Sequence, residues 1–196
     1  MELAFTSVAK VERGPAYAVN PRRLSFFHGE VLLEEADCRE FLAEVLERAK
    51  GAAIRHTRLV YRYDGRNRAN VHLYADGRPD LLFVGCTAGG SLLAGYSEVA
   101  LAPRMPVGGC ALLASLTNRK VFPLAPAKKA LTYDPVFLIF GNSELRVSAD
   151  RPEIYSNFGV TSGVYVARGE KVDCLLGEGQ ARETPLQNYE LHQVIY

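Results

Sequence analysis

The chain has no tryptophan, only two methionines and only four cysteines among its 196 residues. Cys38, Cys86, Cys110 and Cys174 stand far apart and form no C-x-x-C pair, which argues against a zinc site. No apolar run approaches the roughly 20 residues that span a bilayer, and the first residues lack the basic-then-apolar pattern of a signal peptide. We therefore expect a cytoplasmic protein with reduced thiols and no direct membrane insertion.

The chain also lacks an excess of charge of either sign. The chain carries 23 Lys and Arg residues against 22 Asp and Glu residues, a formal net charge of +1. Affinity for nucleic acid comes largely from neutralised phosphates and usually shows as a basic stripe in the sequence. Here the charges are scattered, and only Arg22-Arg23 and Lys128-Lys129 are adjacent basic pairs. We expect no nucleic-acid partner.

What the chain does have is enough length and apolar content for one domain. Residues 1–29 are irregular in pattern and are predicted to be an N-terminal extension that packs on or near the domain, which spans residues 30–196. One segment, EEADCREFLAEVLERAK (34–50), repeats its apolar residues at helical spacing. Gly51 follows it, at the place where a helix end favours a left-handed residue. This pattern predicts a helix that ends near residue 50.

After this helix the hydrophobic period shortens to that of strands. About ten short segments rich in β-branched and aromatic residues are separated by Asp-Gly, Gly-Gly, Asn and Pro. They are RLVYRYDG, NVHLYADG, LLFVG, SLLAGYSE, CALLASLTN, VFPL, PVFLIFG, ELRVSAD, GVYVARG and YELHQVIY. Asp64-Gly65 and the ADGR segment (75–78) are typical of hairpin turns. We predict a β-rich α+β fold, a two-sheet antiparallel β-sandwich flanked by one to three helices.

The polar residues that could carry chemistry form no recognisable catalytic or metal-binding motif. His28, His56, His72 and His192 stand in no metal-binding spacing. His72 and His192 fall in predicted strands, where the alternation places them at the surface or at an edge. Glu144 and Glu190, each flanked by apolar residues, could do acid–base work if brought together. The solvated side of each strand is the interpretation that we favour for both carboxylates.

Cys86 is the candidate reactive thiol. It lies in FVGCTAGGS, a glycine-rich turn after an apolar strand, and backbone amides in such a turn can lower the pKa of a thiol. His72 is the nearest candidate base by sequence. The alternative is that Cys86 fills a bend as a small hydrophobic residue while the glycines turn the chain, and we favour that alternative.

Several segments, in this order, resemble the TLDc domain, which is found in oxidation-resistance proteins and their relatives. The helix followed by TRLVYRYDGR resembles the opening of that domain, and LLFVGCTAGGSLLAGYSE resembles its strand and following turn. The later pieces are CALLASLTNRKVFPL, ALTYDPVFLIFGNSELRVSAD, IYSNFG and YELHQVIY. The resemblance covers about residues 30–196. The chain departs from the family in having Leu93-Ala94 where Phe-Gly is usual and in lacking tryptophan, so it resembles a divergent, single-domain member.

The resemblance implies a fold and a class of function. It implies a β-sandwich that binds other proteins and has no catalytic, cofactor-binding or metal-binding residues. The positions that match the family signature are expected to be structural: Gly95, Tyr96, Leu116, Gly141, Ser156, Asn157, Gly159 and Glu190. Family members are linked to oxidative-stress resistance, and several bind the vacuolar proton ATPase and regulate its assembly.

Three hypotheses for function follow. The first is a non-enzymatic binding module of TLDc type that engages subunits of the vacuolar proton ATPase. The second is a structural component of a microtubule-type cytoskeletal lattice or another large assembly, anchored by bulky residues such as Tyr17, Phe26, Phe27 and Tyr196. The third is a thiol-based antioxidant enzyme that acts through Cys86.

Overall fold

The computed structural model describes residues 36–63, 70–149, 151–156, 165, 175 and 183–196. In this part of the chain ten strands form one antiparallel sheet that does not close on itself. Two helices accompany it, α2 (Ala36–Lys50) and α3 (His72–Ala75). The strands are β1 (His56–Tyr63), β2 (Leu81–Thr87), β3 (Leu92–Ser97), β4 (Ala111–Ser115), β5 (Lys120–Pro123), β6 (Leu131–Tyr133), β7 (Phe137–Phe140), β8 (Leu145–Ser148), β9 (Glu153–Ser156) and β10 (Glu183–Ile195). The predicted β-rich character is confirmed.

Helix α2 forms where the helical spacing predicts it. Cys38, Leu42 and Leu46 recur at intervals of four and are buried, so one stripe of the helix faces the sheet. Gly51 adopts a φ of 71° and its amide donates to the carbonyl of Glu47 at 2.8 Å. Because a left-handed residue costs little only at glycine, this position ends the helix as predicted.

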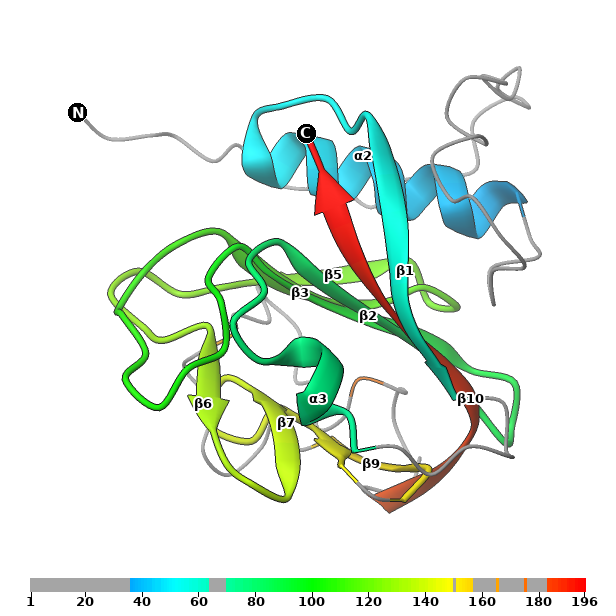
Figure 1. Cartoon of the computed structure of the whole chain (residues 1–196). Helices are drawn as coiled ribbons and strands as arrows, with labels where there is room; N and C mark the ends of the chain where they lie inside the picture. Colours follow the sequence, from blue (N-terminus) through cyan, green and yellow to red (C-terminus); the bar gives the residue numbers. More distant parts are fainter. Residues whose placement is uncertain (1–35, 64–69, 150, 157–164, 166–174, 176–182) are drawn as a thin grey trace.

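The long strand β10 holds the sheet together. The strand order is β5-β4-β3-β2-β10-β9-β8-β7-β6, and β1 pairs with β10 outside this path. Residues 186–193 of β10 pair with β2, and residues 183–185 pair with β9. Figure 1 shows the consequence: β6, β7 and β9 lie below the layer of β2, β3 and β5, and α2 lies above that layer.

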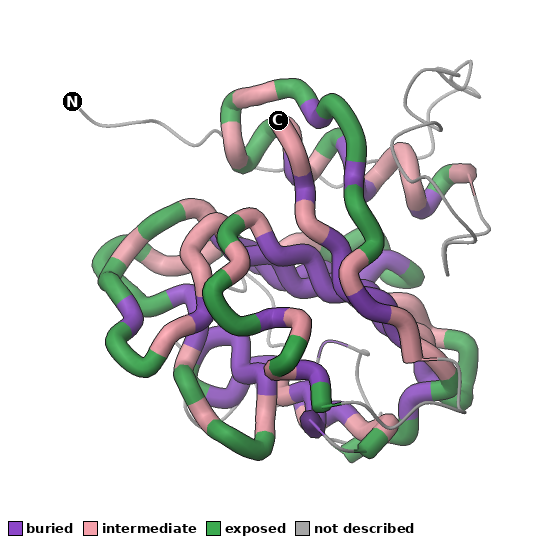
Figure 2. The backbone as a smooth tube through the Cα atoms, in the orientation of Figure 1, coloured by how far each residue is buried: buried purple, intermediate pink, exposed green. Residues whose placement is uncertain are grey.

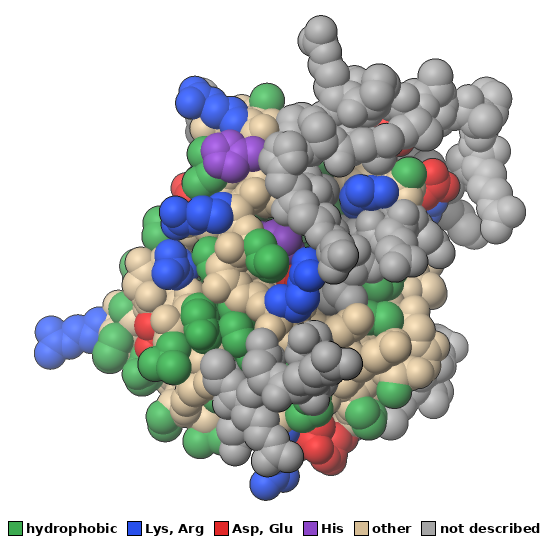
Figure 3. All heavy atoms as spheres, turned by 45° about the vertical axis from the view of Figure 1, so that its right-hand side comes forward, with side chains coloured by type: hydrophobic (Ala, Val, Ile, Leu, Met, Phe, Trp, Pro, Cys, Tyr) green, Lys and Arg blue, Asp and Glu red, His purple; other side chains and the backbone are tan. Residues whose placement is uncertain are grey.

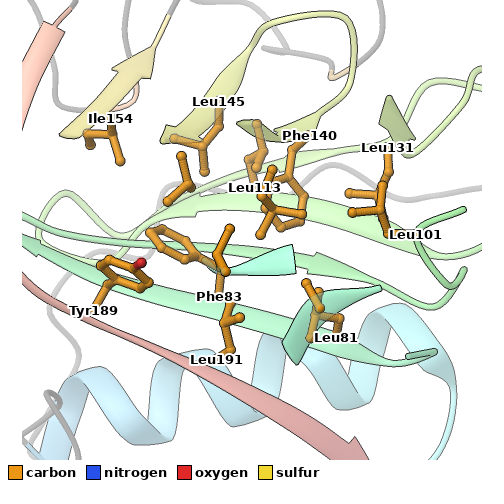
Figure 4. Close-up of a cluster of buried hydrophobic side chains, with 14 of the residues drawn as sticks. Leu81, Phe83, Leu101, Leu113, Leu131, Phe140, Leu145, Ile154, Tyr189 and Leu191 are labelled. Atoms are coloured by element: carbon orange, nitrogen blue, oxygen red, sulfur yellow. The ribbon is translucent and has the colours of Figure 1, made fainter. Parts of the chain in front are cut away.

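Two apolar clusters follow from this arrangement. The larger one lies between the two halves of the sheet, and Figure 4 shows Phe83, Leu113 and Tyr189 pointing toward Phe140 and Leu145 from the other half. The smaller cluster packs α2 against the opposite side of β2, β3 and β4. Strands β2 and β3 therefore have both sides covered, and the buried backbone in Figure 2 is concentrated there.

The prediction of a strand over NVHLYADG is wrong, because residues 72–75 form α3. The side-chain oxygen of Asn70 accepts the amide hydrogen of His72 at 2.9 Å, and the amide of Ala75 donates to the carbonyl of Val71 at 2.9 Å. Gly77 adopts a φ of 72°, so ADGR does turn the chain. The turn joins α3 to β2 and is no hairpin.

Other expectations lie outside the described residues. These are the N-terminal extension (1–29), the Asp64-Gly65 turn, and all of GVYVARG except Tyr165, which is buried. Neither described helix has the length and apolar character that a membrane span requires.

Candidate interaction surface

The signature residue Gly95, on β3, faces Phe140 of β7, a strand in the other half of the sheet. An ideal Cβ built on Gly95 would lie 2.8 Å from Cζ of Phe140, closer than real Cβ contacts come. The Phe140 ring is fully buried. Glycine at position 95 therefore makes room for a ring that comes from β7 in the other half of the sheet.

Gly141, just after β7, also makes room for a buried side chain, that of Glu144. Its φ is 71°, and a Cβ at this position would overlap the carboxylate of Glu144. That carboxylate is fully buried, and its Oε2 accepts the amide hydrogen of Asn142 at 2.7 Å. The expectation of a solvated Glu144 is therefore wrong. Glu144 is an internal acceptor that holds the turn after β7.

The other signature residues that the structure describes are also buried. Tyr96 donates its hydroxyl hydrogen to Oδ1 of Asp80 at 2.6 Å, and Leu116 is 1% exposed in the cluster under α2. Ser156 accepts the amide hydrogen of Leu175 at 2.9 Å through its Oγ. Asn157 and Gly159 lie outside the described residues.

Glu190 belongs to a mostly buried cluster of polar side chains on β1 and β10. Its Oε1 accepts a hydrogen bond from Nε of Arg62 at 2.8 Å, and its Oε2 lies 2.9 Å from Nε2 of His192. Glu190 and His192 are each 1% exposed. The expectations of a solvated Glu190 and a surface His192 are wrong, because residues 189–192 of β10 are buried on both faces of the sheet.

The two carboxylates that could have formed an acid–base pair have separate partners. Glu144 holds the turn after β7, and Glu190 lies between β1 and β2 with Arg62 and His192. Among the described residues, no three His, Cys, Asp or Glu side chains are placed to hold a metal ion. Each of the two carboxylates holds neighbouring structure through its own hydrogen bonds.

A second ionic network ties the end of α2 to the sheet. Nζ of Lys50 lies 3.2 Å from Oδ1 of Asp80 and 2.5 Å from Oε1 of Glu98, and 5.3 Å from the centre of the Tyr196 ring. The hydrogen bond from Lys50, then that from the Cys110 amide, lowers the pKa of Glu98 below its ordinary value. Tyr196 is partly buried and packs against the cluster under α2, so it is no exposed anchor.

Cys86 is placed as a half-buried residue near the end of β2. Its thiol donates weakly to the carbonyl of Thr87 at 3.5 Å, and its cross-strand partners are Asn188 and Leu92. Burial raises the pKa of the Cys86 thiol above its ordinary value, the opposite of what an activated nucleophile needs. His72 begins α3, and its Nδ1 lies 2.7 Å from Oδ1 of Asp76.

The most unusual surface of the described protein surrounds α3. The exposed large hydrophobic residues of the described chain are Leu59, Leu73, Val107, Tyr133 and Val136. All except Leu59 come from three segments, 71–77, 101–109 and 124–136, which we call the α3 end. Leu73 is 76% exposed, Val107 59% and Val136 50%. Figure 3 shows hydrophobic side chains gathered at the surface between charged ones on one face of the molecule.

Backbone and ring contacts join the three segments of the α3 end. The amide of Gly77 donates to the carbonyl of Leu101 at 2.9 Å, and that of Gly108 donates to the carbonyl of Lys128 at 2.8 Å. The His72 and Tyr133 rings lie 5.9 Å apart between centres. The α3 end is therefore one connected surface.

Asp134 fixes the shape of the turn between β6 and β7. Its Oδ1 accepts the amide hydrogens of Val136 at 2.8 Å and Phe137 at 3.1 Å. Val136 in turn accepts the Ala149 amide hydrogen at 2.7 Å through its carbonyl. The backbone that carries the exposed Val136 side chain is therefore held on both sides.

The sequence pattern does not predict the α3 end. Leu73 falls in the segment predicted as a strand, and an exposed side chain cannot be told from a buried one in such a short apolar segment. The one available signal is the Tyr133-Asp134-Pro135-Val136 turn, which places two large apolar residues at a turn where polar ones are common.

Comparison with known proteins adds no family assignment. No protein-family model matches the chain, and no curated protein matches it.

Proposed function

We propose that the protein is a non-enzymatic, protein-binding module of TLDc type that binds its partner through the α3 end. The proposal includes the TLDc-like arrangement, with the two halves of the sheet as the two layers of a β-sandwich and helices at its side. The resemblance of residues 30–196 to that family supports the choice of class. The exposed apolar residues of the α3 end support the choice of surface.

The observation that carries the proposal is the exposure of Leu73, Tyr133 and Val136 on one connected surface. Burying a Leu or Val side chain is worth about 1.5–3 kcal/mol, so an exposed group of such residues is what a binding surface offers. Exposed apolar groups with polar surroundings are typical of protein interaction sites. Asp134 and Ala149 hold the Val136 backbone, which lowers the entropy lost on binding.

In this proposal the partner is a large cytoplasmic assembly, and the vacuolar proton ATPase is the partner that the resemblance favours. The module acts by binding one assembly state of the partner more tightly than another and so shifts the population toward that state. A role in oxidative-stress resistance then follows through the partner. No residue of the module needs to perform chemistry.

Affinity capture from the native cell tests the proposal. The tagged wild-type chain is compared with L73S/V136S at the α3 end and with L59S, which removes an exposed leucine from β1. We expect the wild type and L59S to recover a partner at equal stoichiometry and L73S/V136S to lose it. Recovery of no pump subunits under gentle conditions would remove the vacuolar ATPase as partner. Recovery of a filament lattice that resists salt extraction would favour the structural alternative.

A further inference from the structure

The α3 end differs from the rest of the chain in its charge. No Asp or Glu occurs from Val99 to Tyr133, although the whole chain is balanced in charge. The same stretch contains five basic residues, namely Arg104, Arg119, Lys120, Lys128 and Lys129. A one-sided charge distribution of this kind creates a local positive potential even where the net charge is near zero.

Three of these basic residues, Arg104, Lys128 and Lys129, lie in the segments of the α3 end. The loop that carries Arg104 and the loop that carries Lys128 and Lys129 are joined by the Gly108–Lys128 hydrogen bond and by a parallel bridge between Gly108 and Lys129. All three side chains are exposed, and none forms an ion pair with a residue that the structure describes. Val107, 59% exposed, lies in the same loop as Arg104.

The carboxylates that border this surface are already engaged. Glu98 bonds to Lys50 and to the Cys110 amide, and Asp76 bonds to His72. Asp134 accepts two backbone amide hydrogens of its own turn. These hydrogen bonds direct the three carboxylates toward their own neighbours, and none of them forms an ion pair with Arg104, Lys128 or Lys129.

We propose that the partner segment which binds the α3 end is acidic, with apolar side chains beside its carboxylates. This inference rests on the proposed function and specifies the chemistry of its partner. The apolar side chains cover Leu73, Tyr133 and Val136, and the carboxylates face Arg104, Lys128 and Lys129. A protein segment fits better than an anionic membrane, because polybasic membrane-binding clusters usually contain about four to eight Lys and Arg residues. It also fits better than nucleic acid, since apolar residues occupy much of the surface.

Synthetic peptides test this chemistry directly. One fluorescein-labelled, twelve-residue peptide alternates Glu with Leu, and its control alternates Lys with Leu. Binding is followed by fluorescence anisotropy and stopped-flow mixing at low and high salt. We expect the Glu peptide to bind, the Lys peptide not to bind, and the association rate to fall steeply with salt, because exposed charges are screened beyond about 10 Å at 0.1 M.

A charge-matched pair of variants locates the effect. K128E/K129E reverses two charges at the α3 end, and R48E/R55E makes the same change in net charge on α2 and just before β1. We expect K128E/K129E to slow association of the Glu peptide about tenfold and R48E/R55E to leave it nearly unchanged, because charged residues at the rim mainly set the association rate. Thermal unfolding confirms that each variant is folded.

Several results would overturn the inference. Equal binding of the Glu and Lys peptides, or equal slowing in both charge variants, would show that the basic residues do not select the partner. Preferential binding to phosphatidylserine vesicles or to a single-stranded oligonucleotide would assign the surface to a membrane or to nucleic acid. If affinity capture yields a partner through Leu73 and Val136 while the Glu peptide does not bind, the acidic chemistry fails and the proposed function stands.

Discussion

The ring of Phe140 fills the space that a side chain at Gly95 would need. Because a Cβ on Gly95 would lie 2.8 Å from Cζ of Phe140, and the ring is fully buried, any larger residue must displace a core aromatic side chain. This contact joins β3 in one half of the sheet to β7 in the other. It gives a physical reason for the glycine in a motif that the sequence identifies only by resemblance.

The first prediction concerns this contact. G95A should lower the free energy of unfolding by about 1–3 kcal/mol, the usual effect of overpacking a core. G89A is the matched control, since a Cβ at Gly89 would have Thr87 Oγ1 as its nearest neighbour at 3.8 Å. Chemical denaturation measures both variants. Adding F140L should recover part of the loss in G95A, and equal effects of G95A and G89A would show that the ring does not limit the site.

The second prediction concerns the buried carboxylate of Glu190. E190Q keeps the shape of the side chain but removes the charge that Arg62 and His192 contact, so we expect a loss of about 1.5–3 kcal/mol in the free energy of unfolding. E44Q on α2 is the control, because Glu44 and Arg48 form an exposed pair, a type worth at most about 1 kcal/mol. An E190Q protein as stable as E44Q would contradict the buried cluster.

A feature of the fold can be predicted from the sequence when the contacts that produce it lie within one short segment of the chain. The helix over 36–50 and its end at Gly51 follow from spacing and a single glycine, and both are confirmed. The burial of Glu190 and His192 could not be predicted, because it depends on both faces of β10 being covered by segments distant in sequence, and residues 189–192 are all buried. The alternation over residues 70–77 predicts a strand, but the Asn70 side chain accepts the His72 amide hydrogen and the Val71 amide donates to the Ala149 carbonyl, and these contacts hold α3 instead. The α3 end consists of three segments that lie far apart in the sequence, so no local sequence pattern predicts it.

The third prediction concerns acid stability through Glu98. Lys50 and the Cys110 amide lower the pKa of Glu98 below 4.5. A carboxyl whose pKa is lower in the folded state stabilises the fold above its unfolded pKa and loses this effect as the pH falls through the folded value. Wild-type stability should therefore decline below about pH 4.5 more steeply than that of E98Q. Unfolding midpoints from pH 7 to pH 3 measure this, and E44Q should behave like the wild type.

Lys50, in the same network, should make the stability of the fold depend on pH at alkaline pH. Burial lowers the pKa of Lys50, but hydrogen bonds and charges from Glu98 and Asp80 outweigh that effect and raise it above 10.5. The contribution of Lys50 is therefore present below pH 10.5 and is lost as the pH rises through the folded pKa. K50M should flatten the stability curve in this range, and a curve parallel to the wild type would contradict the assignment.

The next prediction concerns Cys86 and the antioxidant alternative. Because burial raises the pKa of the Cys86 thiol above 9.0, Cys86 should react with iodoacetamide at pH 7 more slowly than an ordinary exposed thiol. Burial raises the pKa of Cys110 to about 11, so that thiol should be slower still. Peptide mass mapping separates the two sites. A Cys86 that reacts faster than glutathione at pH 7 would support the enzyme hypothesis instead.

Binding of the captured partner to the α3 end tests the central claim most directly. The measurement is the dissociation constant of that partner for the wild-type chain, for L73S/V136S and for L59S. Losing two apolar anchors should cost about 3 kcal/mol or more, so L73S/V136S should bind about a hundredfold more weakly while L59S binds like the wild type. Equal affinity of all three proteins would show that the partner binds elsewhere and would contradict the account.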